Sequence, residues 1–227
     1  MNKIKNHRIR GRVVVFTLTL FLTYGVVVGK AIDIAQSKPD KHYQKKYNFS
    51  EDWFTNRIPV WEKILLPYKG KPNLQYLEIG VFEGSSLIWM LENILTHPTS
   101  EATGIDIFPG QLKEIFQENL RIGGFPDKVT VIQGKSQTRL RRLPLNAYNI
   151  IYIDGSHKAK DVLTDAVLCW LLLKENGILI FDDYHWKQND PVQDRPQAAI
   201  DSFLVCFEGH YEVIHRNAQI ILKKREL

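Results

Sequence analysis

The sequence predicts an α/β protein, with a doubly wound sheet of mostly parallel strands, an antiparallel hairpin at the C-terminus and helices on both faces. From residue 75 onward, short apolar runs alternate regularly with amphipathic stretches. Strands that alternate with helices typically form a parallel sheet covered on both sides. The last two apolar runs, 211–217 and 218–224, follow each other without a helical stretch between them. They therefore predict the closing hairpin.

The individual elements follow from the spacing of the apolar residues. Short runs rich in β-branched and aromatic residues predict parallel strands at 75–80, 101–108, 128–134, 148–155 and 177–183. Apolar residues three and four positions apart predict helices over 85–95, 112–120, 158–173 and 196–207, with a short helix after Ser136. Gly123 and Gly124 are expected to end the second of these helices. Together these elements describe a Rossmann-like sheet.

The segment before the first strand is expected to form a lid or cap. Ser50-Glu51-Asp52 has the composition of a helix start, and Pro59 is expected to split the segment into two short helices. Its apolar residues recur at helical spacing, at Phe54, Ile58, Trp61 and Leu65.

Composition and charge exclude several classes of protein. The chain has 227 residues, of which 44% are hydrophobic and 24% charged, which suits one sizeable globular domain with an appendage. The net charge of +5 arises near the N-terminus, because residues 1–30 contain six basic residues and no acidic ones. The remaining residues carry 24 basic and 25 acidic side chains, a net charge of −1. Nucleic acid is therefore not an expected partner.

Residues 13–28 form an uncharged run, VVVFTLTLFLTYGVVV, with basic residues on both sides. As a helix, this run would span about 24 Å, close to the roughly 30 Å of a bilayer core. We expect an uncleaved membrane anchor, and a cleaved signal sequence or a misassigned start are open alternatives. The chain is thus divided into a basic and hydrophobic N-terminus at 1–35, a polar linker at 36–49 and a folded domain at 50–227.

Polar residues follow every predicted strand, at the edge where ligands of such sheets bind. After the first strand, Gly80 and Gly84 allow a tight turn beneath a ligand. Glu78 and Phe82 stand where a nicotinamide-binding turn would need small residues, so a diphosphate is disfavoured. Asp106 ends the second strand, where a carboxylate can accept both hydroxyls of a ribose. A nucleoside that carries an amino acid and no phosphate would suit both the acidic residue Glu78 and the position of Asp106.

Three carboxylates lie at the ends of the fourth and fifth predicted strands, namely Asp154, Asp182 and Asp183. Hard oxygen donors that converge on one point suit Mg²⁺ or a similar divalent cation. His157 lies three residues after Asp154 and is the candidate general base. Asp183 could instead cap the following loop, and Asp106 or Ser85 could cap helices.

Five motifs, LEIGVFEGSS, GIDIF, GKSQ, IDGSH and GILIFDDY, resemble those of the class I S-adenosylmethionine-dependent methyltransferases. The closest resemblance is to the metal-dependent O-methyltransferases of the methyltransferase family 24 type, and it covers roughly residues 50–227. The resemblance implies transfer of a methyl group from S-adenosylmethionine to a hydroxyl of a small molecule or sugar, assisted by the metal. It also implies roles for individual residues: Glu78, Gly80 and Ser86 beside the amino-acid part of the cofactor, Asp106 on its ribose, Ser136 and Gln137 near its adenine, Asp154, Asp182 and Asp183 on the metal, and His157 as base.

Two other functions are compatible with the residues. A metal-dependent hydrolase or phosphoryl-transfer enzyme could use the same aspartates, and a membrane-tethered binding module could keep the fold without turnover. Tyr184 and Trp186 could line the acceptor pocket or serve only in packing. Because S-adenosylmethionine is expected in the cytosol, we expect the anchored domain to face the cytoplasm, with a soluble cytoplasmic or an exported protein as alternatives.

Overall fold

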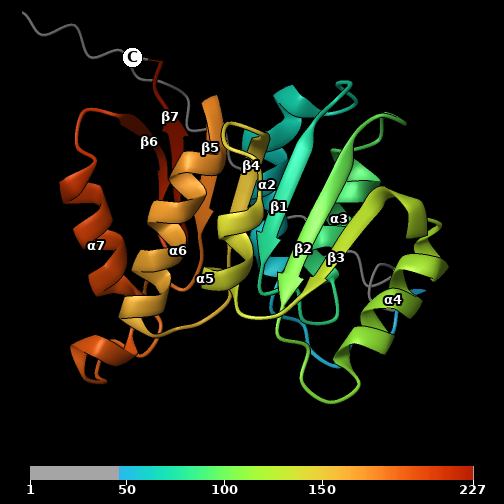
Figure 1. Cartoon of the computed structure of the whole chain (residues 1–227), viewed down its shortest axis with the longest axis horizontal. Helices are drawn as coiled ribbons and strands as arrows, with labels where there is room; N and C mark the ends of the chain where they lie inside the picture. Colours follow the sequence, from blue (N-terminus) through green and yellow to red (C-terminus); the bar gives the residue numbers. More distant parts are fainter. Residues whose placement is uncertain (1–45, 227) are drawn as a thin grey trace, which may run out of the picture. The chain divides into compact units, whose positions relative to one another are not determined.

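A computed structural model describes residues 46–226, and they contain a sheet of seven strands in the order β3-β2-β1-β4-β5-β7-β6 (Figure 1). Strands β1 to β5 run parallel to one another, whereas β7 is antiparallel to both of its neighbours, β5 and β6. The strands are β1 (Gln75–Ile79), β2 (Glu101–Asp106), β3 (Val129–Gln133), β4 (Tyr148–Ile153), β5 (Leu173–Phe181), β6 (Tyr211–Arg216) and β7 (Ile220–Lys224). The mostly parallel sheet and its antiparallel C-terminal hairpin are confirmed.

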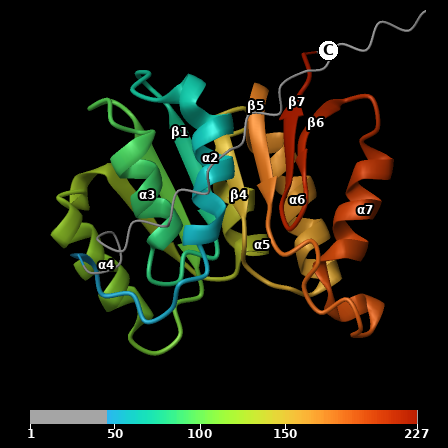
Figure 2. The ribbon, with the colours of Figure 1, turned by 180° about the vertical axis from the view of Figure 1, so that it is seen from behind.

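Helices cover both faces of the sheet, as the two opposite views show (Figures 1 and 2). Successive strand residues point to opposite faces, so Tyr76 and Ile150 pack with the first group of helices and Leu77 and Ile151 with the second. The first group is α2 (Ile58–Leu65), α3 (Ser85–Asn93) and α4 (Leu112–Gly123), and the second is α5 (Ser136–Arg139), α6 (Ala159–Leu172) and α7 (Pro196–Cys206). The doubly wound architecture is therefore confirmed.

The segment before β1, expected to form a lid or cap, packs on the first face of the sheet as part of the folded domain. A short 3-10 helix (Thr55–Arg57) leads directly into α2, and Pro59 lies in the first turn of that helix, where its missing N–H is not needed. Trp61 and Leu65 have no exposed surface and belong to the core of the first face. Helix α2 is thus a structural layer of the domain.

One strand boundary also differs from the prediction. Helix α6 ends at Leu172 and β5 begins at Leu173, four residues before the predicted start at Gly177. Leu173 pairs with Tyr148 in β4, and the register shifts before the next pair, Ile150 with Ile178. The irregular pairing adds a polar stretch to the strand that an apolar pattern could not reveal.

The predicted membrane-anchored localisation, with the domain facing the cytoplasm, must be corrected. In the part of the chain that the structure describes, no helix combines the length and the apolar character needed to cross a bilayer. The run 13–28, on which the prediction depended, lies outside the described residues, and so do most of the segments 1–35 and 36–49. These domain boundaries therefore stay predictions.

Candidate active site

Backbone hydrogen bonds align the carboxyl ends of the central strands at one edge of the sheet. The amide of Asp154, after β4, donates to the carbonyl of Ile79 in β1 over 2.8 Å. The amide of Asp182, after β5, donates to the carbonyl of Ile153 in β4 over 3.1 Å. The polar residues predicted at these strand ends therefore meet at one edge of the sheet.

The glycine turn after β1 packs directly against the turn after β4. Gly80 has a φ of +83°, and a Cβ atom at this position would lie 2.0 Å from the carbonyl oxygen of Asp154. Gly84 also has a positive φ, +91°, and immediately precedes α3. A pocket lies over this turn, lined by residues 80–83 and 85–86, by Tyr152 and Asp154, and by four side chains of the segment 49–54.

Glu78 lies behind this pocket and not in its lining. The side chain is completely buried, and its two oxygens accept hydrogen bonds from the hydroxyls of Tyr76 (2.6 Å) and Ser86 (2.5 Å). Burial raises the pKa of the Glu78 carboxyl to about 8, against the lowering effect of the two hydroxyls. Of the three residues expected beside the amino-acid part of a cofactor, Gly80 and Ser86 line the pocket, and Glu78 holds Ser86 in place.

Glu78→Gln is expected to change how stability depends on pH. Because the pKa of Glu78 is raised from 4.5 to about 8 in the folded protein, the folded state keeps a proton that the unfolded state releases. The wild-type chain should therefore lose stability as the pH rises from about 4.5 to about 8. Glutamine cannot ionise, so the variant should gain about 2–4 kcal/mol relative to wild type between pH 5 and pH 8.5.

Urea unfolding of the full chain at pH 5, 7 and 8.5 measures this difference. Glu212→Gln, at an exposed position on β6, is the matched control and should follow the wild-type curve. Parallel pH curves for wild type and Glu78→Gln would show that burial does not raise the pKa of Glu78.

Asp106 uses both carboxylate oxygens to shape two neighbouring loops. Oδ2 accepts the amide of Phe82 over 2.9 Å, and Oδ1 accepts the amide of Phe108 over 2.8 Å. The next helix, α4, has Gln111 and not Asp106 at its N-cap. Since each carboxylate oxygen has two lone pairs, Asp106 can still accept hydrogen bonds from two hydroxyls.

Ser136 and Gln137 are held by a residue that the sequence analysis missed. The Ser136 hydroxyl donates to Asp165 Oδ2 over 2.8 Å, and the Gln137 amide donates to Asp165 Oδ1 over 3.1 Å. Burial raises the pKa of Asp165 to about 7. Asp165 lies within α6, in a stretch whose apolar pattern indicated only a core helix.

Two of the three predicted metal ligands lie together with the predicted base. Asp154, His157 and Asp183 each offer a ligand atom, and these atoms lie within 4.8 Å of one another. The Nε2 atom of His157 is 2.7 Å from Oδ2 of Asp183. Asp183 has a φ of +57°, in the left-handed region, and is the second residue after the end of β5. Such a conformation is uncommon for aspartate, so the local fold holds this carboxylate in a constrained position.

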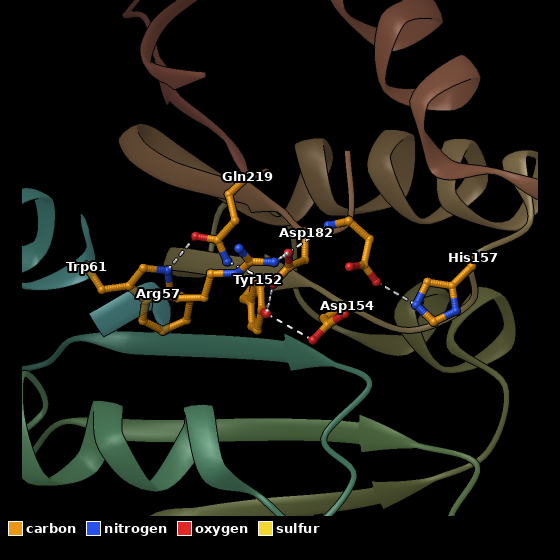
Figure 3. Close-up of polar contacts among 8 residues, drawn as sticks. Arg57, Trp61, Tyr152, Asp154, His157, Asp182 and Gln219 are labelled. Atoms are coloured by element: carbon orange, nitrogen blue, oxygen red, sulfur yellow. Dashed lines mark hydrogen bonds and ion pairs between the residues drawn. The ribbon is translucent and has the colours of Figure 1, made fainter. Parts of the chain in front are cut away.

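Asp182 points into a buried group of polar side chains, which the hydroxyl of Tyr152 connects to Asp154 over 2.9 Å (Figure 3). It forms an ion pair with Arg57, whose Nη2 lies 3.0 Å from Oδ1. It also accepts hydrogen bonds from Tyr152 and Gln219. Arg57 and Gln219 carried no motif in the sequence, because their partners lie 125 and 37 residues away along the chain.

The segment that closes the pocket is fixed to the glycine turn by residues that also escaped prediction. The buried carboxylate of Glu83 accepts the amide and the hydroxyl of Ser50, over 2.6 Å and 2.8 Å. The side chain of Asn119, on α4, bonds both the amide and the carbonyl of Asn48. The wall of the pocket is therefore part of the folded domain.

Tyr184 and Trp186, which follow β5, differ in role. Tyr184 is buried and donates its hydroxyl to Asp201 on α7 over 2.8 Å, so it serves packing. Trp186 is 45% exposed, and its ring centroid lies 5.3 Å from that of His157. Of these two aromatic residues, only Trp186 presents an exposed ring beside His157.

The strand order, the glycine turn after β1 and the acidic residue after β2 define the class I methyltransferase fold. Known proteins agree with this assignment. A family described as "Methyltransferase domain" matches residues 77–184. An uncharacterized protein of Acanthamoeba polyphaga mimivirus is 31% identical over 152 residues, which cover 63% of this chain and 67% of that protein.

Two solved structures share the fold at low sequence identity. The O-methyltransferase from Bacillus cereus in complex with SAH has a TM-score of 0.63 at 14% identity, over 86% of this chain and 94% of that chain. The MycE methyltransferase from the mycinamycin biosynthetic pathway, in complex with Mg, SAH and mycinamycin VI, has a TM-score of 0.56 at 19% identity, over 82% of this chain and 53% of that chain. The chain belongs to the methyltransferase-domain family and has the fold of the class I S-adenosylmethionine-dependent O-methyltransferases, which confirms the resemblance found in the sequence.

Proposed function

We propose that this protein transfers the methyl group of S-adenosylmethionine to a hydroxyl oxygen of a small molecule or sugar, with the help of a divalent cation. The observation that carries the proposal is the grouping of Asp154, His157 and Asp183 beside a pocket that lies over the Gly80 turn. A proton acceptor and two hard oxygen donors at the end of a cofactor pocket suit deprotonation of a hydroxyl.

The residues of the pocket fit an adenosyl cofactor that carries an amino acid. The absence of a Cβ at Gly80 lets this turn pack against the backbone of Asp154, and the pocket lies over the packed turns. The backbone amide of Ser86, in the first turn of α3, suits a carboxylate. We assign the ribose to Asp106 and the adenine to the loop of Ser136 and Gln137, which Asp165 holds in place.

The residues around His157 fit a divalent cation. We assign its binding to the carboxylates of Asp154 and Asp183, and Mg²⁺ is the expected ion because both ligands are hard oxygen donors. When bound, the cation supplies Lewis-acid catalysis and lowers the pKa of the acceptor hydroxyl. The MycE structure, which shares this fold, contains Mg together with SAH and mycinamycin VI.

His157 is assigned as the base that takes the proton of the hydroxyl. Its Nε2–H donates to Oδ2 of Asp183, which leaves Nδ1 as the nitrogen that can accept a proton. The Asp183 carboxylate would then stabilise the imidazolium that forms. The exposed ring of Trp186 lies against His157 and is assigned to the acceptor side of the site.

Asp106→Ala is expected to weaken binding of S-adenosylmethionine by at least about tenfold, because two hydrogen bonds from hydroxyls to a charged acceptor are lost. Calorimetric titration of S-adenosylmethionine into the full chain measures the affinity. Asp127→Ala, an exposed aspartate just before β3, is the matched control and should bind like wild type. If the folded wild-type chain did not bind S-adenosylmethionine, the proposed function would be wrong.

A further inference from the structure

Hydrogen-bond donors surround the carboxylate of Asp182 on both oxygens. Oδ1 accepts the Nη2 of Arg57 over 3.0 Å and the backbone amide of Asp183 over 2.7 Å. Oδ2 accepts the Nε2 of Gln219 over 2.8 Å. The single hydroxyl hydrogen of Tyr152 is shared between Oδ2 of Asp182 and Oδ2 of Asp154, which lies 2.9 Å from the hydroxyl oxygen. Cation binding by Asp182 would therefore require one of these donors to leave.

The orientation of Gln219 is fixed, so its donor cannot simply turn away. The indole N–H of Trp61 donates to Oε1 of Gln219 over 2.9 Å. An indole nitrogen can only donate a hydrogen bond, so the Gln219 oxygen must face Trp61 and the Gln219 amide nitrogen must face Asp182. Both Trp61 and Gln219 are buried. A flip of the amide would bring two donors together at Trp61 and two acceptors together at Asp182.

Asp182 also differs from the nearby carboxylates Asp154 and Asp183 in the cation with which it is paired. The side chain of Asp182 is 6% exposed, and the guanidinium of Arg57 is the cation paired with it. A buried carboxylate that loses its partner is strongly destabilising. Among the described residues, no lysine or arginine forms an ion pair with Asp154 or Asp183, so these two carboxylates are the ones available to a divalent cation.

The ion pair also connects the pocket wall to the sheet. Arg57 ends the short 3-10 helix that follows the segment 49–54, whose side chains line the pocket. Asp182 follows β5 in the middle of the sheet. Figure 3 shows Arg57 reaching from the side of Trp61 to Asp182, with Asp154 and His157 beyond.

We propose that Asp182 is not a cation ligand but a positioning residue, which anchors Arg57 and thereby fastens the pocket wall 46–57 to the strand that carries the cation site. The cation ligands are then Asp154 and Asp183. This inference rests on the metal-assisted function proposed above, and it departs from the ligand set of Asp154, Asp182 and Asp183 that the sequence resemblance implied.

Two measurements on the full chain test the proposal. In the first, amide hydrogen exchange of residues 46–57 should be about tenfold or more faster in Arg57→Gln than in wild type, since the anchor of the segment is lost. Arg57→Lys, which keeps a cationic donor, should restore part of the protection. Arg121→Gln, which removes an exposed ion pair with Glu118, is the matched control and should leave this segment unchanged. Unchanged exchange in Arg57→Gln would overturn the proposal.

In the second measurement, Mn²⁺ affinity is followed by the electron paramagnetic resonance signal of free Mn²⁺. Asp183→Asn should weaken binding at least about tenfold more than Asp182→Asn, whose loss should stay within the roughly 10–100-fold expected for a residue outside the ligand set. Equal losses in the two folded variants would overturn the proposal.

If Asp182→Asn does not fold, the Mn²⁺ affinity of Arg57→Gln provides the second test in its place. If Asp182 were a ligand held back by Arg57, removal of the arginine would raise the Mn²⁺ affinity, and such a rise would overturn the proposal. If the wild-type chain bound no Mn²⁺, the metal-assisted function would fail, and the exchange of residues 46–57 would alone decide whether Asp182 anchors Arg57.

Discussion

Replacing Gly80 by alanine is expected to lower the free energy of unfolding by more than about 4 kcal/mol. A Cβ atom at this position would lie 2.0 Å from the carbonyl oxygen of Asp154 and 2.7 Å from the Cα of Gly155. These are backbone atoms of the turn after β4, so no side-chain rotation can relieve the contact. The positive φ of Gly80, +83°, adds a further cost for alanine.

Gly80→Ala is expected to disturb the proposed cofactor pocket as well as to lower the stability of the fold. Gly80 and Asp154 both line the pocket, and separating the two turns would displace Asp154 from His157 and Asp183. Any Gly80→Ala protein that still folds should therefore bind S-adenosylmethionine at least about tenfold more weakly, a loss of about 1.4 kcal/mol or more.

Gly124→Ala is a matched control that separates backbone strain from the steric contact. Gly124 has nearly the same φ, +81°, but a Cβ atom there meets nothing within 4 Å. This variant should lose only the roughly 1–2 kcal/mol expected of an alanine in the left-handed region. Thermal unfolding of both variants, with calorimetric titration of the cofactor, gives the comparison. Equal losses of stability in Gly80→Ala and Gly124→Ala would show that the two turns do not need their close contact.

The strands and the layers of this protein were predictable because local patterns encode them. The apolar run 148–155 and the amphipathic stretch 158–173 each carry the period of their element, and the structure contains β4 and α6 at these places. Parallel order then brings the ends of β1, β4 and β5 to one edge. The meeting of Asp154 with His157 and Asp183 follows from that topology.

What the sequence could not reveal depends on partners that are distant along the chain. Asp182 and Asp183 are adjacent, and the pattern treats them alike. The structure distinguishes them, because Arg57 and Gln219 approach one carboxylate and His157 the other. Similarly, Glu78 was expected in the pocket, but its position on β1 buries it beneath Ser86. The periodicity of apolar residues predicts which face of the sheet a residue occupies. It does not predict which side chain, distant along the chain, will pair with that residue.

Replacing His157 by alanine is expected to lower the rate of methyl transfer by a factor of about 10²–10⁴, the usual contribution of a general base. The loss should appear in kcat, because His157 touches neither the glycine turn nor Asp106 among the contacts that the structure describes. The affinity for S-adenosylmethionine should therefore stay within about threefold of wild type. Methyl transfer from labelled cofactor, measured with a panel of phenol and sugar acceptors, provides the rates.

The same variant distinguishes a base from a cation ligand, since the ring nitrogens of His157 lie close enough to Asp154 and Asp183 for either role. A base that contacts a ligand only from outside the ligand set should cost no more than roughly 10–100-fold in Mn²⁺ affinity, and less than the loss of a ligand in Asp183→Asn. His210→Ala, at an exposed position before β6, is the matched control for both measurements. If His157→Ala lost Mn²⁺ binding as completely as Asp183→Asn, His157 would be a ligand, and the proton of the acceptor would have to leave by another group. Full activity of His157→Ala would exclude both roles.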